Sequence, residues 1–369
     1  MTCIIGTAFA SAVAPMLCIA TSCPDPDPLP TIARAQDSST QPAPDPTPRN
    51  KSTFDPEISL VTDFRWNAID SDRAGRKRVF LREAELGLAA DVDPFLRAEA
   101  TIAFADEDGE THAEVEEAFG RYNNLGRGLS ARFGKFAAAI GRVQRNHADQ
   151  LNWLDYPLMV QDVLGDEGLR AGGVSFSYLF PGDRFNEITL EAFDSHDLGI
   201  FAGANAGAPT FVGAYRTFFD FGADASAQVG FSYANGPSSS EEERKRSQLF
   251  AAEVTYKLRP GGQGSSLDFE GEAFWARPGG IHETSFGAFA AVTIELRPRL
   301  HAYVKYDYSE VPGTDDIRRA WSLGATLKVT EFHHWRAEFQ RIESNFAPAR
   351  NLLNLQFQWA IGAHPAHRY

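Results

Sequence analysis

The sequence predicts an all-β protein, a transmembrane, antiparallel, up-and-down β-barrel of about 16 strands. Three observations lead to this fold class. Apolar and polar residues alternate almost throughout after residue 55, short and long connections alternate, and aromatic residues gather near the ends of the predicted strands. A strand with a period of two has one apolar and one polar side. Such strands suit a wall that separates lipid from water.

The alternation is clearest in residues 95–104. Segments of about 10 to 13 residues with this pattern recur to the end of the chain, and their length suits a tilted strand that crosses a bilayer. No stretch after residue 55 has the long apolar run of a transmembrane helix. In residues 95–104 one face carries Leu96, Ala98, Ala100, Ile102 and Phe104, and the other carries Phe95, Arg97, Glu99, Thr101 and Ala103.

The connections between these segments form two classes. Short periplasmic turns and long extracellular loops are typical of such barrels. The longest connection, 138–169, follows the fifth predicted strand, which makes it the third external loop. The short turns include 91–94, 181–183 and 297–299, and the long connections include 68–77, 195–209 and 235–246.

Aromatic residues mark both ends of the predicted strands. Trp66, Trp275 and Trp321 fall toward the external side, and Trp335 and Trp359 fall toward the periplasm. A membrane barrel needs aromatic side chains at both interfaces. A soluble β-sandwich or propeller, the alternative fold, gives no reason for this distribution.

The N-terminal region predicts export. Residues 3–20 are apolar, and Ala33-Arg34-Ala35 offers a cleavage site, although no basic residue precedes Arg34. A lipoprotein site at Cys23 and a retained anchor are the alternatives. We therefore expect a signal peptide at 1–35, a Pro-rich disordered lead-in at 36–54 and the barrel at 55–369. The three cysteines all lie within the first 23 residues, so the predicted mature chain has no disulfide.

Composition and motifs exclude several functions. The formal net charge of −14 argues against nucleic acid as a partner, because phosphate binding needs a basic surface. The chain has no Gly-x-Ser-x-Gly elbow, phosphate loop or dinucleotide fingerprint. The sequence thus predicts neither an enzyme nor a cofactor.

The connection 138–169 combines polar residues with hydrophobic residues such as Trp153, Leu154 and Met159. A connection this long in a compact fold is usually functional. We expect it to fold inward, pack against the wall and narrow the pore. An ordinary external loop is the alternative.

Several motifs resemble one known family. They are Gly134-Lys135-Phe136, Gly141-Arg142, Asn146 to Leu151, Asp155-Tyr156-Pro157 and Gly165 to Leu169, with Glu83 to Leu88, Asp91 to Pro94 and the ending from Gly362 to Tyr369. These motifs are similar to those of outer-membrane proteins grouped with the phosphate-selective porins O and P, over residues 55–369. The resemblance implies a barrel of about 16 strands, often trimeric, that passes anions through a basic constriction.

By position, Lys135 and Arg142 match the basic residues beside the family's inward loop, while Arg145 and His147 are additions of this sequence. The polar strand faces are acidic as often as basic, which leaves anions, cations and general polar solutes all open as cargo. We expect the basic side chains to face acidic ones across the pore. The expected constriction residues are Lys135, Arg142, Arg145, His147, Arg97, Arg132, Glu83, Glu85, Glu99, Glu114 and Glu116.

The sequence thus predicts a passive diffusion channel for small polar or ionic solutes in the bacterial outer membrane. Its expected partners are membrane lipid, the solutes and, from the resemblance, further copies in a homotrimer. One alternative is a metal (zinc) uptake or binding protein that uses external histidines. Others are a barrel enzyme and a structural or adhesion barrel. The histidines considered are His112, His147, His196 and His282.

Overall fold

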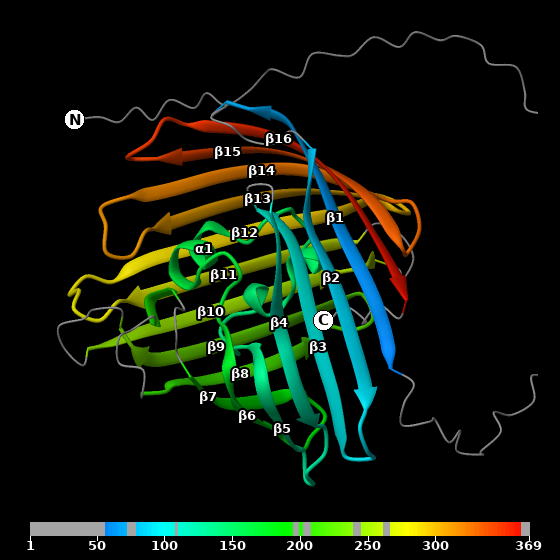
Figure 1. The fold of residues 1–369 in the computed structure, drawn as a ribbon, viewed down its shortest axis with the longest axis vertical. Coiled ribbons are helices and arrows are strands. Elements are labelled where there is room, and N and C mark those ends of the chain that lie inside the picture. Colours follow the sequence, from blue (N-terminus) through cyan, green and yellow to red (C-terminus); the bar gives the residue numbers. More distant parts are fainter. Residues whose placement is uncertain are drawn as a thin grey trace, which may run out of the picture. The chain divides into compact units, whose positions relative to one another are not determined.

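The computed structural model describes residues 56–71, 79–107, 110–194, 199–201, 208–238, 245–260 and 266–362. These residues form a closed barrel of 16 strands, in which each strand pairs with its chain neighbours and β1 closes on β16 (Figure 1). All the pairs are antiparallel, so the predicted fold class is confirmed. The expected signal peptide (1–35), the lead-in (36–54) and His196 lie outside the described residues. Among the described residues, no helix has both the length and the hydrophobicity to cross a membrane.

The strands follow the predicted segments closely. The connection between β5 and β6 contains the short helices η1, η2 and α1, and η3 lies between β7 and β8. The bounds are β1 Glu57–Asp70, β2 Val79–Asp91, β3 Leu96–Glu107, β4 Glu110–Tyr122, β5 Leu129–Ala137, η1 Val143–Arg145, η2 Ala148–Gln150, α1 Leu158–Leu164, β6 Arg170–Leu179, β7 Asn186–Phe193, η3 Gly199–Phe201, β8 Thr210–Asp220, β9 Ala225–Pro237, β10 Arg246–Leu258, β11 Leu267–Arg277, β12 Ser285–Arg297, β13 Leu300–Glu310, β14 Ile317–Lys328, β15 His333–Ser344 and β16 Arg350–Gly362.

The wall has an apolar outside and a largely polar inside. In β14, Trp321 and Leu323 are 57% and 62% exposed, whereas Ser322 between them is buried. In β16, Asn354 and Gln356 are buried on the inner face. A soluble barrel would reverse this pattern, because its apolar side chains would fill a dry centre. The observed pattern is that of a wall between lipid and water.

The connection 138–169 lies inside the ring of strands (Figure 1). Trp153 is 1% exposed and packs on Phe289 of β12, with ring centroids 5.4 Å apart. Burial of one such side chain stabilises the packed loop by about 1.5–3 kcal/mol. The expected inward loop is therefore confirmed, and an ordinary external loop is not what the structure shows.

The inner wall opposite this loop is apolar. Inward residues of strands β4 to β13 belong to the same cluster of buried side chains as the loop, which departs from the simple rule that the inner face is polar. The loop and this part of the wall form one hydrophobic core. The wall contributes Phe193, Val212, Leu249, Phe274 and Phe289, and the loop contributes Ile140, Val143, Trp153, Met159, Val163 and Leu164.

Two close approaches fix the loop on the wall. At Gly287 of β12, a Cβ atom would lie 2.5 Å from Met159 Cβ. At Gly141, which has a φ of +57°, a Cβ atom would lie 1.6 Å from Glu272 Oε1. Gln144 joins the two ends of the loop, since it donates to the Ile140 carbonyl at 3.1 Å and accepts from Leu169 N at 3.1 Å.

Candidate pore constriction

Residues 142–150 of the inward loop lie between two cavities in the lumen. The cavities measure about 310 and 450 Å³, and Arg142, Asn146, Asp149 and Gln150 line both of them. Charged side chains of the wall meet the loop on several sides. The contacts of these side chains determine how wide and how charged the remaining passage is.

On one side, the loop arginines meet carboxylates of β10 and β11. Arg142 forms an ion pair with Glu270, and Arg145 Nη2 lies 3.4 Å from Glu253 Oε1. Glu272 Oε2 accepts from Arg142 N and Val143 N, each at 3.2 Å. The positive charge of both loop arginines is thus locally balanced by glutamates of the adjacent wall.

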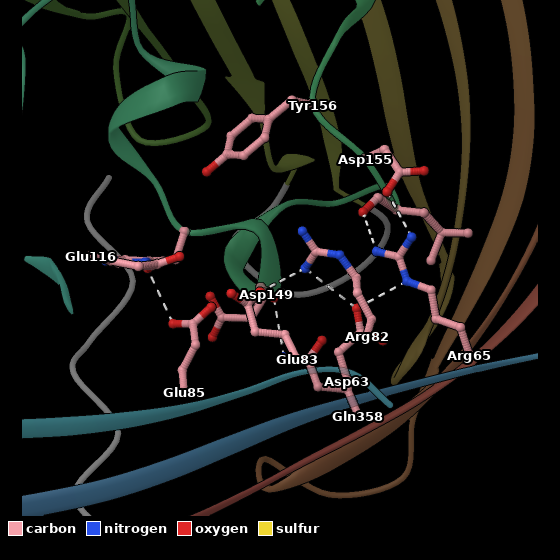
Figure 2. A network of polar contacts seen from close by, with 12 residues as sticks. Asp63, Arg65, Arg82, Glu83, Glu85, Glu116, Asp149, Asp155, Tyr156 and Gln358 are labelled. Atoms are coloured by element: carbon pink, nitrogen blue, oxygen red, sulfur yellow. Dashed lines mark hydrogen bonds and ion pairs between the residues drawn. The ribbon is translucent and has the colours of Figure 1, made fainter. Parts of the chain in front are cut away.

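On the other side, Arg65 of β1 binds the loop, and both Arg65 and Arg82 of β2 lie beside Asp63 (Figure 2). Arg65 donates to Asp155 Oδ1 at 2.6 Å and to the Leu154 carbonyl at 2.7 Å, and Asp63 Oδ2 lies 3.0 Å from Arg65 Nε. Burial alone would raise the pKa of Asp155. The positive charges of Arg65 and Arg82 lower it by more than burial raises it, so the pKa of Asp155 lies below its usual value.

Arg82 reaches the lumen because of a β-bulge. Asp63 pairs with Glu83 and Phe64 pairs with Leu81, so Arg82 is the extra residue on β2. A bulge re-aims a side chain that strict alternation would place on the opposite face. Arg82 Nη1 therefore lies 2.9 Å from Glu83 Oε2 and 3.7 Å from Asp63 Oδ2.

His147, at the start of η2, lies among three glutamates. Its Nδ1 is 2.6 Å from Glu116 Oε2 and 3.4 Å from Glu85 Oε2, and its Nε2 is 3.6 Å from Glu117 Oε2. Burial lowers the pKa of His147, but Glu85, Glu116 and Glu117 raise it more, and the net pKa is well above its usual value. Figure 2 shows Glu85 and Glu116 beside the chain of contacts that runs to Arg65.

Glu116 and Glu117 both face His147 because β4 also has a bulge. Thr101 pairs with Glu117 and Ile102 pairs with Val115, so Glu116 is the extra residue. Adjacent residues of a regular strand point to opposite faces. The bulge instead brings two neighbouring carboxylates to one histidine.

A third group of wall residues binds the loop backbone. Arg336 of β15 donates to the carbonyls of Trp153 and Leu151, each at 2.8 Å. Glu338 Oε2 accepts from Tyr303 Oη at 2.6 Å and from Leu154 N at 3.4 Å. These buried wall groups satisfy loop backbone groups that the short helices leave open.

The remaining expected residues are more dispersed. Arg132 Nη2 lies 3.0 Å from Glu191 Oε1, and Glu99 Oε1 lies 2.6 Å from Arg121 Nη2; Arg132 and Glu99 line the smaller cavity. Lys135 Nζ lies 2.9 Å from Glu114 Oε1 in a partly exposed pair. Arg97 pairs with Glu57 near the turn between β2 and β3. The lining of the smaller cavity includes none of Lys135, Glu114 and Arg97.

The sequence analysis missed several residues that hold the loop. Arg82 and Glu117 each follow or precede another charged residue in the sequence, at 82–83 and 116–117. Adjacent residues of a regular strand point to opposite faces, so two adjacent charged residues are the one sequence signal of a bulge here. The other contacts join distant parts of the chain, which a single sequence does not reveal. The missed residues are Asp63, Arg65, Arg82, Glu117, Gln144, Asp155, Glu253, Glu270, Glu272, Arg336 and Glu338.

The closed barrel of 16 strands matches the fold of solved outer-membrane porins. The channel DcaP of Acinetobacter baumannii is similar, with a TM-score of 0.58 and 12% identity over 83% of this chain and 96% of that one. The anion-selective porin from Comamonas acidovorans has a TM-score of 0.57 and 11% identity over 83% of this chain and 100% of that one. The trimer form of OmpT from Vibrio cholerae, an outer-membrane protein, has a TM-score of 0.54 and 13% identity over 83% of this chain and 98% of that one.

In sequence, an uncharacterised protein of Aquifex aeolicus is 27% identical, over 88% of this chain and 82% of that protein. No protein-family model matches the chain. At these identities the solved structures establish the fold, and the porin part of the sequence resemblance agrees with them. The resemblance to phosphate-selective porins in particular stays a prediction.

Proposed function

We propose that this protein is a channel of the bacterial outer membrane that lets small polar and ionic solutes diffuse passively. One observation carries the proposal: polar cavities of about 310 and 450 Å³ border the inward loop inside a wall whose outer face is apolar. Weak, multiple contacts along such a lining allow solutes to enter and to leave. The proposal includes no catalytic activity. It includes assembly as a homotrimer, which is supported by the trimer form of the similar barrel OmpT from Vibrio cholerae.

The ion pairs of the constriction favour weak charge selectivity. Arg142 and Arg145 face Glu253, Glu270 and Glu272, so no uncompensated basic row follows the loop. Arg132 is likewise paired with Glu191. Selectivity for phosphate or another anion is therefore a separate hypothesis, more specific than the proposed diffusion of small polar and ionic solutes. The constriction proposed from the sequence keeps Arg142, Arg145, His147, Arg132, Glu85 and Glu99 as residues that line the cavities.

Planar bilayer recordings test the proposal. The folded protein should give stepwise conductance and a small reversal potential in a salt gradient. Replacement of Arg142 and Arg145 by Glu should shift the reversal potential toward cations. Arg341→Glu is the control, because Arg341 lies on β15 in an exposed pair with Glu343 and contacts none of the wall carboxylates that pair with Arg142 and Arg145. Absence of conductance in wild type would favour an adhesion barrel or an enzyme instead, and an unchanged potential would remove these arginines from selectivity.

A further inference from the structure

Three side chains from separate segments meet at one point of the lumen. Glu85 comes from β2, Glu116 from β4 and His147 from the inward loop, and one ligand atom of each lies within 4.8 Å of the others. Glu116 is 5% exposed and Glu85 is 8% exposed. Carboxylate oxygen and imidazole nitrogen together suit divalent ions such as Zn²⁺, Mn²⁺ and Co²⁺.

The closest contact of this group joins His147 Nδ1 and Glu116 Oε2, which form an ion pair of 2.6 Å when the imidazole is protonated. Both atoms are buried, and neither makes a well-aligned hydrogen bond. Ligand atoms of a tetrahedral ion, each about 2.0–2.2 Å from the metal, lie about 3.3–3.6 Å apart. The 3.4 Å between His147 Nδ1 and Glu85 Oε2 already meets that spacing, and a shift of the imidazole ring would bring Glu116 to it.

The second nitrogen of His147 faces a carboxylate, which is the type of group that supports many metal-binding histidines. Nε2 faces Glu117 Oε2 at 3.6 Å, and Glu117 Oε1 accepts from Ala137 N at 2.8 Å. A carboxylate that accepts from the outer ring nitrogen fixes the tautomer and leaves Nδ1 as the ligand atom. The bulge at Glu116 is what allows neighbouring residues to take both roles, one as ligand and one as support.

The local charge also favours a cation. The carboxylates near this point belong to Glu83, Glu85, Glu116, Glu117 and Asp149, and the nearby guanidinium groups belong to Arg82 and Arg170. Arg82 is already paired with Glu83, and Arg170 donates to backbone carbonyls and to Tyr156 Oη at 3.3 Å. Carboxylates therefore outnumber guanidinium groups here, and a divalent ion can take the place of the protons that such a crowded group of carboxylates and imidazole holds.

We infer that Glu85, Glu116 and His147 bind one divalent transition-metal ion of the Zn²⁺ class, which fastens the inward loop to β2 and β4. Glu85, His147 and Asp149 line the smaller cavity, so the ion is reached from the lumen and keeps open coordination positions on that side. The site shares His147 with the zinc site considered from the sequence, but His112 and His282 are exposed and do not belong to it. Metal binding here does not depend on the proposed channel function.

Metal titration of the full chain, folded in detergent, tests the site. One equivalent of Co²⁺ should bind and give the visible d–d absorption bands of a protein-bound Co²⁺ ion. Added Zn²⁺ should displace the Co²⁺ and remove these bands. His147→Ala and the near-isosteric Glu116→Gln should each lose the one-equivalent binding, and Glu117→Gln should weaken it roughly 10- to 100-fold. His112→Ala, on the same strand as Glu116, is the control and should bind like wild type. Gel mobility before and after heating should confirm that each variant is folded.

The fastening is tested with trypsin, which cleaves after loop arginines once they are released. Zn²⁺ should slow cleavage of wild type at Arg142 and Arg145, and a chelator should restore it. The same additions should leave His147→Ala unchanged. Absence of one-equivalent binding, or equal binding by folded His147→Ala, would overturn the site. Binding without any change in cleavage would overturn the fastening. Neither outcome involves conductance, so a failed channel assay remains a separate result.

Discussion

Arg65 of β1 and Asp155 of the inward loop form an ion pair of 2.6 Å, and the same guanidinium donates to the Leu154 carbonyl at 2.7 Å. The side chain of Arg65 is 7% exposed and that of Asp155 is 38% exposed. One wall residue thus holds both a charged side chain and a backbone group of the loop. The barrel is closed by strand pairing without this contact. Loop attachment and barrel formation are therefore separable.

Arg65→Met should loosen the loop and leave the barrel folded. The substitution removes hydrogen bonds to Asp155 and Leu154 and should destabilise the packed loop by about 1–3 kcal/mol, since the pair is partly exposed. Trypsin should then cut the loop at Arg142 or Arg145 faster than in wild type. Arg341→Met, which removes an exposed pair with Glu343, should leave the cleavage rate unchanged. Equal protection of Arg65→Met and wild type would show that other contacts hold the loop.

Acid should release the same contact. The pKa of Asp155 is lowered in the folded protein, so the ionised form contributes stability above the usual pKa of about 4. That contribution is lost as the pH falls through the lower, folded pKa. In a variant with Trp153 as its single tryptophan, quenching by acrylamide should rise below about pH 4. The same variant with Asp155→Asn should already be more accessible at pH 7. A flat response of wild type from pH 7 to pH 3 would contradict this account.

The sequence was sufficient for the wall and for the direction of the loop. Alternation places Asn354 and Gln356 inside and Leu353 and Leu355 outside because the period of a strand is two. The hydrophobic residues in 138–169 identified the loop as one that packs. Alternation alone does not tell what covers a given face, so it did not predict that Phe289 on the inner face of β12 packs on Trp153.

The constriction was harder to predict than the wall. Arg82 and Glu116 reach the lumen through bulges, and a bulge depends on the register between two strands rather than on one strand's own sequence. The arginines of the loop were expected to face carboxylates across the pore. Arg142 and Arg145 instead contact Glu270 and Glu253 directly, since packing of the loop on β10 and β11 brings these groups together.

Gly141→Ala should detach the first turn of the loop. The residue has a φ of +57°, and a Cβ atom there would lie 1.6 Å from Glu272 Oε1, the carboxylate that accepts from Arg142 N and Val143 N through its other oxygen. Gly165→Ala is a matched control in the same loop, because Gly165 has a φ of +92° and no atom within 4 Å of its added Cβ. Gly141→Ala costs about 1–2 kcal/mol of backbone strain. Gly165→Ala costs about 1–3 kcal/mol, because its φ of 92° and ψ of 173° lie in a region that is essentially restricted to glycine. Only Gly141→Ala should also raise the tryptic cleavage rate after Arg142, and equal rates in the two variants would remove the Glu272 contact from the argument.

The apolar outer face predicts how charge is tolerated along one strand. Leu323 lies at the middle of β14 and is 62% exposed, whereas Leu327, 47% exposed on the same face, lies near the strand end. An arginine at the bilayer midplane costs about 2–4 kcal/mol, and one near the interface costs about 0–1 kcal/mol. Leu323→Arg should therefore lower the free energy of unfolding in lipid vesicles several times more than Leu327→Arg, measured by urea titration of folded barrels. In a detergent micelle the two variants should differ less, because the micelle deforms around the charge. Equal, small effects at both positions in lipid would mean that this face of β14 does not contact the hydrocarbon region of a membrane.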